Sequence, residues 1–213
     1  MVQQHHFGMC FLISINKGCI MNLPNKLTVF RIILIPVFIL LLTVPYAWSN
    51  ISFLGATMPV NWLIAAVVFA IASATDFLDG QIARSQHLVT NFGKFADPLA
   101  DKLLVMTALI FLTSFNVVPA WMTAVIVIRE LAVTGLRTLI VENNGKVLAA
   151  QMPGKIKTFS QMFAIFFLYI HNAPFSIINF PIGDVLLWVA VIFTIYSGID
   201  YFWQNRNVFS DGM

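Results

Sequence analysis

Four aspartates, arranged in two closely spaced pairs, are the residues of this sequence best suited to carry out chemistry. They are Asp76, Asp79, Asp97 and Asp101, and they make up four of the nine acidic residues in the 213-residue chain. Carboxylate oxygens are the ligands that hard divalent cations prefer, and such cations in turn bind phosphate groups. The pattern, called the aspartate motif below, therefore predicts a metal site that acts on a phosphate-bearing substrate.

Two small residues and an arginine accompany the first two aspartates. On a helix, Gly80 and Ala83 continue the face that carries this pair, and Arg84 lies one position further. The small side chains would let a ligand come close to the backbone. The guanidinium of Arg84 can pair with an aspartate or hold a phosphate oxygen through two hydrogen bonds.

The second pair of aspartates repeats this arrangement. Gly93, Asp97 and Asp101 fall at positions i, i+4 and i+8, which is again one helical face. Pro98 lies between the aspartates and is tolerated if the helix begins only about one turn earlier. The alternative is a charged, solvated loop with helix-capping aspartates, and Asp97 before Pro98 fits an N-cap. That alternative requires the whole pattern to share these offsets by coincidence.

The elements that must position these residues are long apolar helices. The chain is 59% hydrophobic and only 10% charged, with a mean hydropathy of +0.86, which is typical of a polytopic membrane protein. Each apolar span is about long enough to cross a hydrocarbon core of ~30 Å as a helix, which satisfies its own backbone groups. The six spans are roughly 27–45, 58–80, 95–115, 117–141, 156–172 and 183–204. We therefore predict an all-α integral membrane protein with six transmembrane helices.

The basic residues predict how the chain is oriented in the cell membrane. The connections around 46–57, 115–119 and 172–182 contain no lysine or arginine, so with six spans every basic residue belongs to one side. The positive-inside rule makes that side cytoplasmic, together with both termini and the aspartate motif. The net charge of +3 and the pI near 9.0 favour anionic head groups and phosphates. The sequence contains no motif for binding nucleic acid, so we expect no such partner.

Residues 1–20 differ in character from the rest of the chain. They are of mixed composition and contain both cysteines, Cys10 and Cys19, but lack the basic region and cleavage site of a signal peptide. We interpret them as an N-terminal extension, introduced by cloning or by the choice of start site, rather than as a functional segment. Residues 21–213 are then one six-helix domain. Two cysteines on the reducing side of the membrane argue against structural disulfides.

The aspartate motif resembles the signature of the CDP-alcohol phosphotransferase family. It reads Asp76-x-x-Asp79-Gly80-x-x-Ala83-Arg84, eight residues, then Gly93-x-x-x-Asp97-x-x-x-Asp101, and every fixed position of the signature is matched. The resemblance implies a six-helix membrane enzyme, usually a homodimer, that uses divalent cations, mostly magnesium or manganese. Such an enzyme moves a substituted phosphoryl group from a CDP-linked donor to an alcohol and releases CMP.

Three further segments extend the resemblance to particular bacterial members of this family. They are MNLPNKLTVFRIILIP from Met21, RELAVTGLR from Arg129 to Arg137, and GKIKTFSQM from Gly154 to Met162. These segments are similar to those of members that make phosphatidylglycerol phosphate. The reaction implied is transfer of a phosphatidyl group from CDP-diacylglycerol to glycerol 3-phosphate, with release of CMP.

The resemblance also suggests a role for each aspartate. We predict Asp76, Asp79 and Asp97 as the main ligands of two divalent cations, magnesium or manganese. Asp101 would complete the shell of the second cation. The family pattern also makes Asp101 the general base that accepts the proton of the acceptor hydroxyl.

A pocket for the CDP-linked lipid is implied next to the first aspartate pair. Gly80 and Ala83 would leave room for the cytidine, and Arg84 would hold a phosphate. Asn25 and Thr28, at the mouth of the first span, could close this pocket from the other side. Alternatively, these two residues start the helix, since Asn25 is a good N-cap residue.

An anionic acceptor requires a second basic site beside the metals. Arg129 lies deep in an apolar run, where a charged side chain needs a partner or a cavity, and Arg137 shares its helical face eight residues later. We predict that Arg129, Arg137 and Lys155 hold the acceptor phosphate, with Lys157 as a further candidate. Alternatively, Arg129 pairs with an acid such as Glu130, and the lysines extend to the membrane interface.

Other acceptors and other classes of function remain open. Inositol phosphate requires similar cations, whereas serine or another neutral alcohol would not need the two arginines. A cation transporter would place its carboxylates near the bilayer midplane within an inverted repeat, and neither feature is evident. A silent membrane scaffold would not need an intact motif. Asp200, near the cytoplasmic end of the last span, is expected to make a structural pairing.

Overall fold

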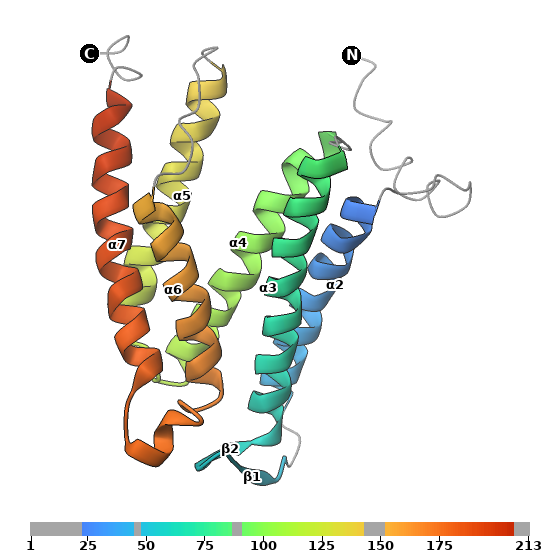
Figure 1. The fold of residues 1–213 in the computed structure, drawn as a ribbon, viewed down its shortest axis with the longest axis vertical. Helices are drawn as coiled ribbons and strands as arrows, with labels where there is room; N and C mark the ends of the chain where they lie inside the picture. Colours follow the sequence, from blue (N-terminus) through green and yellow to red (C-terminus); the bar gives the residue numbers. More distant parts are fainter. Residues whose placement is uncertain (1–22, 45–47, 87–90, 143–151, 207–213) are drawn as a thin grey trace.

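The computed structural model describes residues 23–44, 48–86, 91–142 and 152–206, with the backbone alone for residues 23–26, 76–86, 91–98, 101 and 141–142. Within these ranges the fold is mainly six long helices (Figure 1). They are α2 (Leu23–Thr43), α3 (Val60–Gln86), α4 (Asn91–Ser114), α5 (Ala120–Glu142), α6 (Met152–Tyr169) and α7 (Ile182–Gln204). Each predicted apolar span lies mostly within one of these helices, so the prediction of a mainly helical fold is confirmed.

The helices run alternately up and down, which brings related helix ends together. In Figure 1 the ends of α3, α5 and α7 and the starts of α2, α4 and α6 lie toward the top. α2 packs against α3 and α4, α7 packs against α5 and α6, and α6 also contacts α3 and α4. The upper part of the bundle therefore collects the helix segments that carry the aspartate motif and the basic residues.

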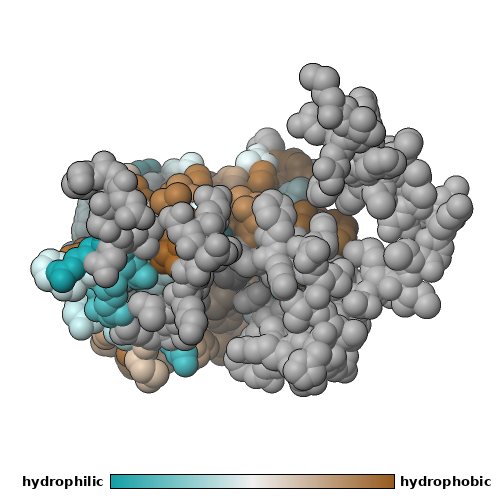
Figure 2. Space-filling model, turned by 90° about the horizontal axis from the view of Figure 1, so that it is seen from above, coloured by the Kyte–Doolittle hydropathy of each residue, from teal (hydrophilic) through white to brown (hydrophobic). Residues whose placement is uncertain are grey.

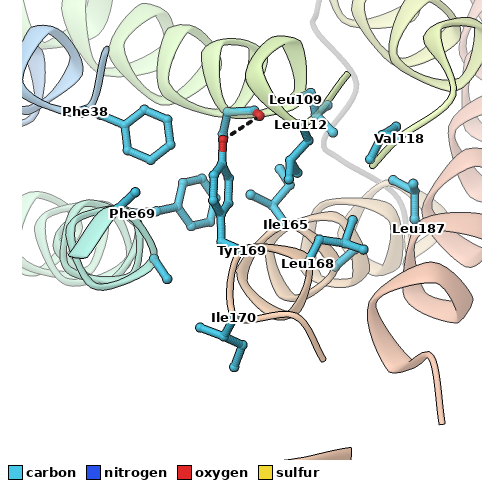
Figure 3. Close-up of a cluster of buried hydrophobic side chains, with 14 of the residues drawn as sticks. Phe38, Phe69, Leu109, Leu112, Val118, Ile165, Leu168, Tyr169, Ile170 and Leu187 are labelled. Atoms are coloured by element: carbon cyan, nitrogen blue, oxygen red, sulfur yellow. Dashed lines mark hydrogen bonds between the residues drawn. The ribbon is translucent and has the colours of Figure 1, made fainter. Parts of the chain in front are cut away.

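Aromatic and small residues form the core between the helices (Figure 3). Phe38 of α2 and Tyr169 of α6 pack edge to face, with ring centroids 5.5 Å apart. The buried hydroxyl of Tyr169 donates a hydrogen bond to the Ala108 carbonyl of α4 over 2.9 Å. Buried alanines such as Ala65 and Ala164 let the helix backbones approach closely. These contacts fix α6 against the N-terminal helices and so hold the two ends of the chain in one bundle.

Threonine hydroxyls on the helices find partners within their own helix. Thr43, Thr75, Thr113 and Thr194 each donate to the carbonyl four residues earlier, over 2.6 to 2.9 Å. An unpaired hydroxyl in apolar surroundings is costly, and these bonds within one helix remove that cost. The helices can therefore carry hydroxyls and still suit an apolar environment.

A short hairpin closes the lower end of the bundle. β1 (Asn50–Phe53) pairs antiparallel with β2 (Ala56–Pro59) through a two-residue turn in which Leu54 and Gly55 have φ of 46° and 84°. The 3-10 helix η1 (Phe175–Ile178) lies against this turn, since a Cβ added at Gly55 would come within 2.5 Å of Ile177 Cγ1. The sequence analysis treated residues 46–57 as a plain connection and did not predict this hairpin.

Among the described helices, α7 is the one that is both long and apolar enough to span a membrane. Shorter apolar stretches cover Leu27–Thr43 of α2, Val60–Thr75 of α3 and Lys102–Ser114 of α4. In the sequence, Asp76 directly follows the stretch in α3, and Asp101 directly precedes the stretch in α4. Large apolar side chains are exposed elsewhere on the bundle, for example Ile128 and Phe159, each 66% exposed.

Candidate functional site

The aspartate motif lies on two consecutive helices at one end of the bundle. Asp76 and Asp79 belong to the second half of α3, and Asp97 and Asp101 belong to the first half of α4. Residues 87–90 are all that separates the two helices, whose ends lie together at the top of Figure 1. The fold therefore brings both aspartate pairs to the same end of the molecule.

The helix boundaries decide two of the capping alternatives. α4 begins at Asn91, six residues before Asp97, so the interpretation of Asp97 as an N-cap is wrong. α2 already includes Leu23, so Asn25 also lies within a helix rather than at its N-cap. Pro98 falls beyond the first turn of α4, deeper than the sequence analysis expected, where its missing N–H removes an intrahelical hydrogen bond.

The side chains of the predicted metal ligands and of most of the predicted CDP-lipid pocket lie outside the described residues. They are Asp76, Asp79, Asp97, Asp101, Gly80, Ala83, Arg84 and Asn25. Thr28, the remaining residue of that pocket, has a fully buried side chain in α2. The roles given to these residues therefore stay predictions.

A cavity of about 190 Å³ lies between α5, α6 and α7 and reaches α4. Three basic side chains, two carboxylates and several hydroxyls surround it, and we call it the basic cavity. Its lining residues are Lys102, Arg129, Glu130, Val133, Thr134, Arg137, Pro153, Gly154, Thr158, Ser197, Asp200, Tyr201 and Gln204. Seen from the upper end, hydrophilic surface gathers on the side where α7 lies (Figure 2). Because Lys102 directly follows Asp101, the basic cavity borders the α4 segment of the aspartate motif.

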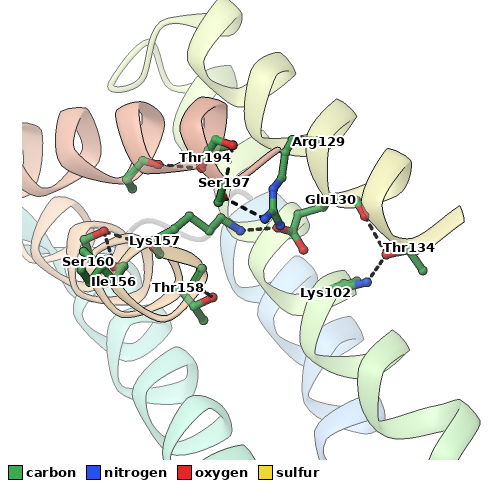
Figure 4. Close-up of polar contacts among 12 residues, drawn as sticks. Lys102, Arg129, Glu130, Thr134, Ile156, Lys157, Thr158, Ser160, Thr194 and Ser197 are labelled. Carbon is green, nitrogen blue, oxygen red and sulfur yellow. Dashed lines mark hydrogen bonds and ion pairs between the residues drawn. The ribbon is translucent and has the colours of Figure 1, made fainter. Parts of the chain in front are cut away.

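Arg129 is held on two sides of its guanidinium (Figure 4). Its Nη1 donates to Glu130 Oε1 over 3.0 Å, and its Nη2 donates to Ser197 Oγ of α7 over 2.9 Å. α7 passes close to the arginine stem, since a Cβ added at Gly198 would lie 3.1 Å from Arg129 Cγ. These contacts give the guanidinium a defined position in the cavity wall.

The carboxylate of Glu130 joins two cations from different helices. Its Oε1 also accepts a hydrogen bond from Lys157 Nζ of α6 and forms an ion pair with it. Lys157 is only 4% exposed, and a carboxylate partner offsets the cost of burying its charge. The alternative in which Arg129 pairs with Glu130 is thus confirmed. Arg129 nevertheless lines the basic cavity, so the pairing does not exclude a role in binding.

Lys102 is a cavity residue that the sequence analysis did not assign. Its Nζ donates to Thr134 Oγ1, and that hydroxyl donates to the Glu130 carbonyl over 2.6 Å. The sequence did offer one signal for a functional role of Lys102, because this lysine follows the last aspartate of the motif at the edge of an apolar span. Its approach to α5 depends on helix packing and could not be read from spacing along the chain.

The residues at the end of α7 form the remaining wall of the cavity. Arg137 lies over the ring of Tyr201, with its guanidinium carbon 5.5 Å from the ring centroid. Arg129 and Arg137 line the same cavity, so the prediction that they share one helical face is confirmed. Asp200 Oδ1 accepts a hydrogen bond from Gln204 Nε2 over 2.8 Å, which is a structural pairing of the expected kind. Asp200 also lines the cavity, which the sequence analysis did not expect.

The two lysines predicted beside the arginines lie in different surroundings. Lys155 is exposed and lies outside the lining of the basic cavity as described. Lys157 borders a second cavity of about 40 Å³, which shares Lys102, Glu130 and Thr158 with the basic cavity. The lysine that joins the two arginines at the basic cavity is therefore Lys102.

Comparison with known proteins decides the family. Residues 21–196, well over half of the chain, match the model of the CDP-alcohol phosphatidyltransferase family. The chain belongs to this family. The resemblance indicated by the aspartate motif is thereby confirmed. The two cavities therefore belong to a CDP-alcohol phosphatidyltransferase.

Several similar CDP-alcohol phosphatidyltransferases carry one name, CDP-diacylglycerol–glycerol-3-phosphate 3-phosphatidyltransferase. The protein of Bacillus subtilis (strain 168) is 53% identical over 184 residues, which cover 86% of this chain and 95% of that protein. The protein of Rickettsia typhi is 40% identical over 189 residues, which cover 88% and 99%. The protein of Pseudomonas fluorescens is 38% identical over 186 residues, which cover 85% and 88%.

Proposed function

We propose that this chain transfers the phosphatidyl group of CDP-diacylglycerol to glycerol 3-phosphate, giving phosphatidylglycerol phosphate and CMP in phospholipid biosynthesis. The observation that carries the proposal is the basic cavity, where Lys102, Arg129 and Arg137 lie next to the α4 segment of the aspartate motif. A phosphorylated acceptor requires cations at such a place, whereas a neutral alcohol does not. Relatives named for these two substrates support the choice of acceptor.

Two divalent cations, magnesium or manganese, would be held by the aspartate motif. Four carboxylates on consecutive helices, from the second half of α3 and the first half of α4, would form a donor set of oxygens that suits hard cations. When bound, the cations would neutralise charge on the pyrophosphate of the donor. Asp76, Asp79 and Asp97 are proposed as the main ligands, with Asp101 as a further ligand of the second cation.

The protein side chains would activate and place the acceptor. The oxygen of the acceptor hydroxyl would attack the lipid-linked phosphorus while Asp101 accepts the proton of that hydroxyl. The bond between this phosphorus and CMP would break, and CMP would leave with its electrons. Arg129 and Arg137 would hold the acceptor phosphate. Because Arg129 is already fixed by Glu130 and Ser197, little reorganisation would be needed on binding.

The two lysines of α6 would act more indirectly on the same phosphate. Lys157 would add to the positive potential from its place beside Glu130, and Lys155 would act from outside the cavity. On the donor side, Gly80, Ala83 and Arg84 would line the pocket for the CDP-linked lipid. Asn25 and Thr28 of α2 would close that pocket.

In the membrane the chain would cross six times, with both termini and the active site on the cytoplasmic side. Large apolar side chains on the outward faces of α5, α6 and α7, including Ile128, Phe159 and Ile199, support contact with lipid. The connections at the hairpin end carry no basic residues, which fits the positive-inside rule. A homodimer is proposed from the family resemblance.

Release of CMP by the detergent-purified protein tests the proposed reaction. CDP-diacylglycerol and magnesium or manganese would be supplied, with glycerol 3-phosphate, inositol phosphate, serine and glycerol offered separately. Of these four acceptors, we expect only glycerol 3-phosphate to support turnover. Turnover with inositol phosphate instead would keep the family chemistry and refute the acceptor. A folded protein that releases no CMP with any acceptor would favour a transporter or a scaffold.

Asp101→Asn is the matched variant for the chemical step. It removes the proton acceptor but keeps the size of the side chain, so turnover should be abolished while binding of the CDP-lipid is largely kept. Normal turnover in this variant would show that Asp101 is not the base.

A further inference from the structure

The basic cavity contains two side chains on α7 that binding of a phosphate does not require. Tyr201 lines the cavity, and its hydroxyl is buried without a hydrogen-bond partner among the described residues. Asp200 places a carboxylate among the cations of the same cavity. A carboxylate repels a phosphate, so Asp200 calls for a ligand group of another kind.

The hydroxyl of Tyr201 is placed where a bound ligand could supply its hydrogen-bond partner. Buried hydroxyls are normally hydrogen-bonded, because leaving one unpaired costs free energy. The guanidinium of Arg137 lies over the Tyr201 ring at 5.5 Å, which holds the ring against the cavity wall. A phenol can both donate and accept a hydrogen bond, so an alcohol group of a bound molecule is a suitable partner.

The carboxylate of Asp200 has unused capacity to accept hydrogen bonds. Its Oδ1 accepts from Gln204 Nε2 over 2.8 Å, which orients the group. The ion pairs found among the described side chains join Glu130 to Arg129 and to Lys157 and do not involve Asp200. An ionised carboxylate has about four acceptor sites, so Asp200 can still accept a hydrogen bond from an alcohol O–H.

We propose that Asp200 and Tyr201 recognise the free hydroxyl of a phosphorylated polyol bound in the basic cavity. The inference rests on the proposed function, because it takes glycerol 3-phosphate as the acceptor. The phosphate lies against Arg129 and Arg137, and the middle hydroxyl donates to Asp200 and accepts from Tyr201. The terminal hydroxyl is the one that reacts, so the two residues select the acceptor and take no part in bond breaking. The same carboxylate disfavours acceptors that carry a second phosphate.

Propane-1,3-diol monophosphate separates recognition of the acceptor from its reaction. It keeps the phosphate and the terminal hydroxyl of glycerol 3-phosphate but lacks the middle hydroxyl. The quantity to measure is the ratio of kcat/KM for glycerol 3-phosphate to kcat/KM for this analogue, from CMP release with magnesium present. The unmodified protein should prefer glycerol 3-phosphate by on the order of tenfold or more, and Asp200→Asn and Tyr201→Phe should each lose most of that preference.

Matched controls are available on the same helix. Asp184 lies in the first turn of α7, at the opposite end, and Tyr196 is 58% exposed. Asp184→Asn and Tyr196→Phe should keep the ratio of the unmodified protein. If both Asp200→Asn and Tyr201→Phe also keep it, even with lower activity on both acceptors, the two residues are merely structural and the inference is overturned. Absence of CMP release with glycerol 3-phosphate in the unmodified protein would instead refute the proposed function.

Discussion

At the scale of single residues, Glu130 determines how the basic cavity arranges its charges. Its carboxylate contacts Arg129 of its own helix and Lys157 of α6, both within largely apolar helices. Without a shared anion, two cations in surroundings of low dielectric constant would repel each other and lose their pairing. Glu130 is therefore expected to position the cations rather than to bind the acceptor itself.

Replacing Glu130 tests this positioning role. Glu130→Gln should lower the melting temperature and raise KM for glycerol 3-phosphate, because Arg129 and Lys157 lose their common carboxylate. Removing one partner of a fully buried pair costs about 3–5 kcal/mol. The loss should be smaller here, since 17% of the Glu130 side chain is exposed. Thermal unfolding in detergent and acceptor kinetics measure both effects.

Glu130→Asp serves as the control for that substitution. It keeps the negative charge on a shorter side chain, so it should restore part of the stability and part of the acceptor affinity. If Glu130→Gln left both the melting temperature and KM unchanged, the carboxylate would have no role in holding the cations.

A second residue-level prediction concerns the close approach of α7 to Arg129. In Gly198→Ala the new Cβ would lie 3.1 Å from Arg129 Cγ, so the arginine must shift. We expect KM for glycerol 3-phosphate to rise several-fold, while KM for CDP-diacylglycerol stays the same. Steady-state CMP release with each substrate varied in turn measures the two constants.

Gly135→Ala on α5 is the matched control for this prediction. An added Cβ there meets nothing within 4 Å. Alanine is favoured over glycine in a helix interior by about 0.5–1 kcal/mol, so this variant should be slightly more stable with unchanged KM values. Identical acceptor kinetics in both variants would mean that Arg129 adjusts freely and that its position is not critical.

At the scale of elements, the sequence predicted the helices better than the contacts between them. The six apolar spans correspond to α2 through α7, because length and composition are strong signals for such helices. The hairpin was missed because Leu54-Gly55 lacks the usual Asn-Gly or Asp-Gly turn signal. Arg129 and Arg137 could be paired from their spacing on one helix. Lys102 and Tyr201 could not, because they reach the cavity through the packing of separate helices.

The turn of the hairpin gives a prediction at this scale. Gly55 has φ of 84°, where a side chain is strained, and a Cβ would lie 2.5 Å from Ile177 Cγ1. Gly55→Ala should therefore lower the free energy of unfolding by roughly 1–2 kcal/mol from the backbone term alone. Activity below the melting temperature should be unchanged, because the hairpin lies at the end of the bundle away from the basic cavity (Figure 1).

The double variant Gly55→Ala/Ile177→Ala separates the two causes. Shortening Ile177 removes the clash but leaves the unfavourable φ, so thermal unfolding should recover only in part relative to the single variant. A single variant as stable as the unmodified protein would mean that the turn readily adopts another conformation.

At the scale of the whole molecule, polar groups concentrate toward one end of an apolar bundle. The helix segments that carry the aspartate motif lie toward the upper end of Figure 1. The basic cavity is lined in part by the start of α6 and the end of α7, whereas the aromatic core contains Tyr169 at the other end of α6. The helices pack through apolar contacts and contacts between small residues, which do not depend on a bound ion. Catalysis and folding should therefore respond differently when divalent cations are removed.

Chelation measures this difference directly. Treatment with EDTA should abolish CMP release, and added magnesium or manganese should restore it, while the far-ultraviolet circular dichroism of the protein stays constant. The expected cause is loss of the ions held by the aspartate motif, with the packing of α2 through α7 kept. Full turnover after removal of all divalent metal, verified by elemental analysis, would refute the predicted metal site.

The residues around the basic cavity come from several helices. α7 supplies four of the lining residues, Ser197, Asp200, Tyr201 and Gln204, but none of the aspartates of the motif. If the proposed roles hold, α7 would contribute to the choice of acceptor without taking part in breakage of the donor bond. Mutations in α7 could redirect the product to a new head group while the reactive centre is inherited unchanged. Exchange of this one helix between relatives would be a direct route to engineered phospholipids.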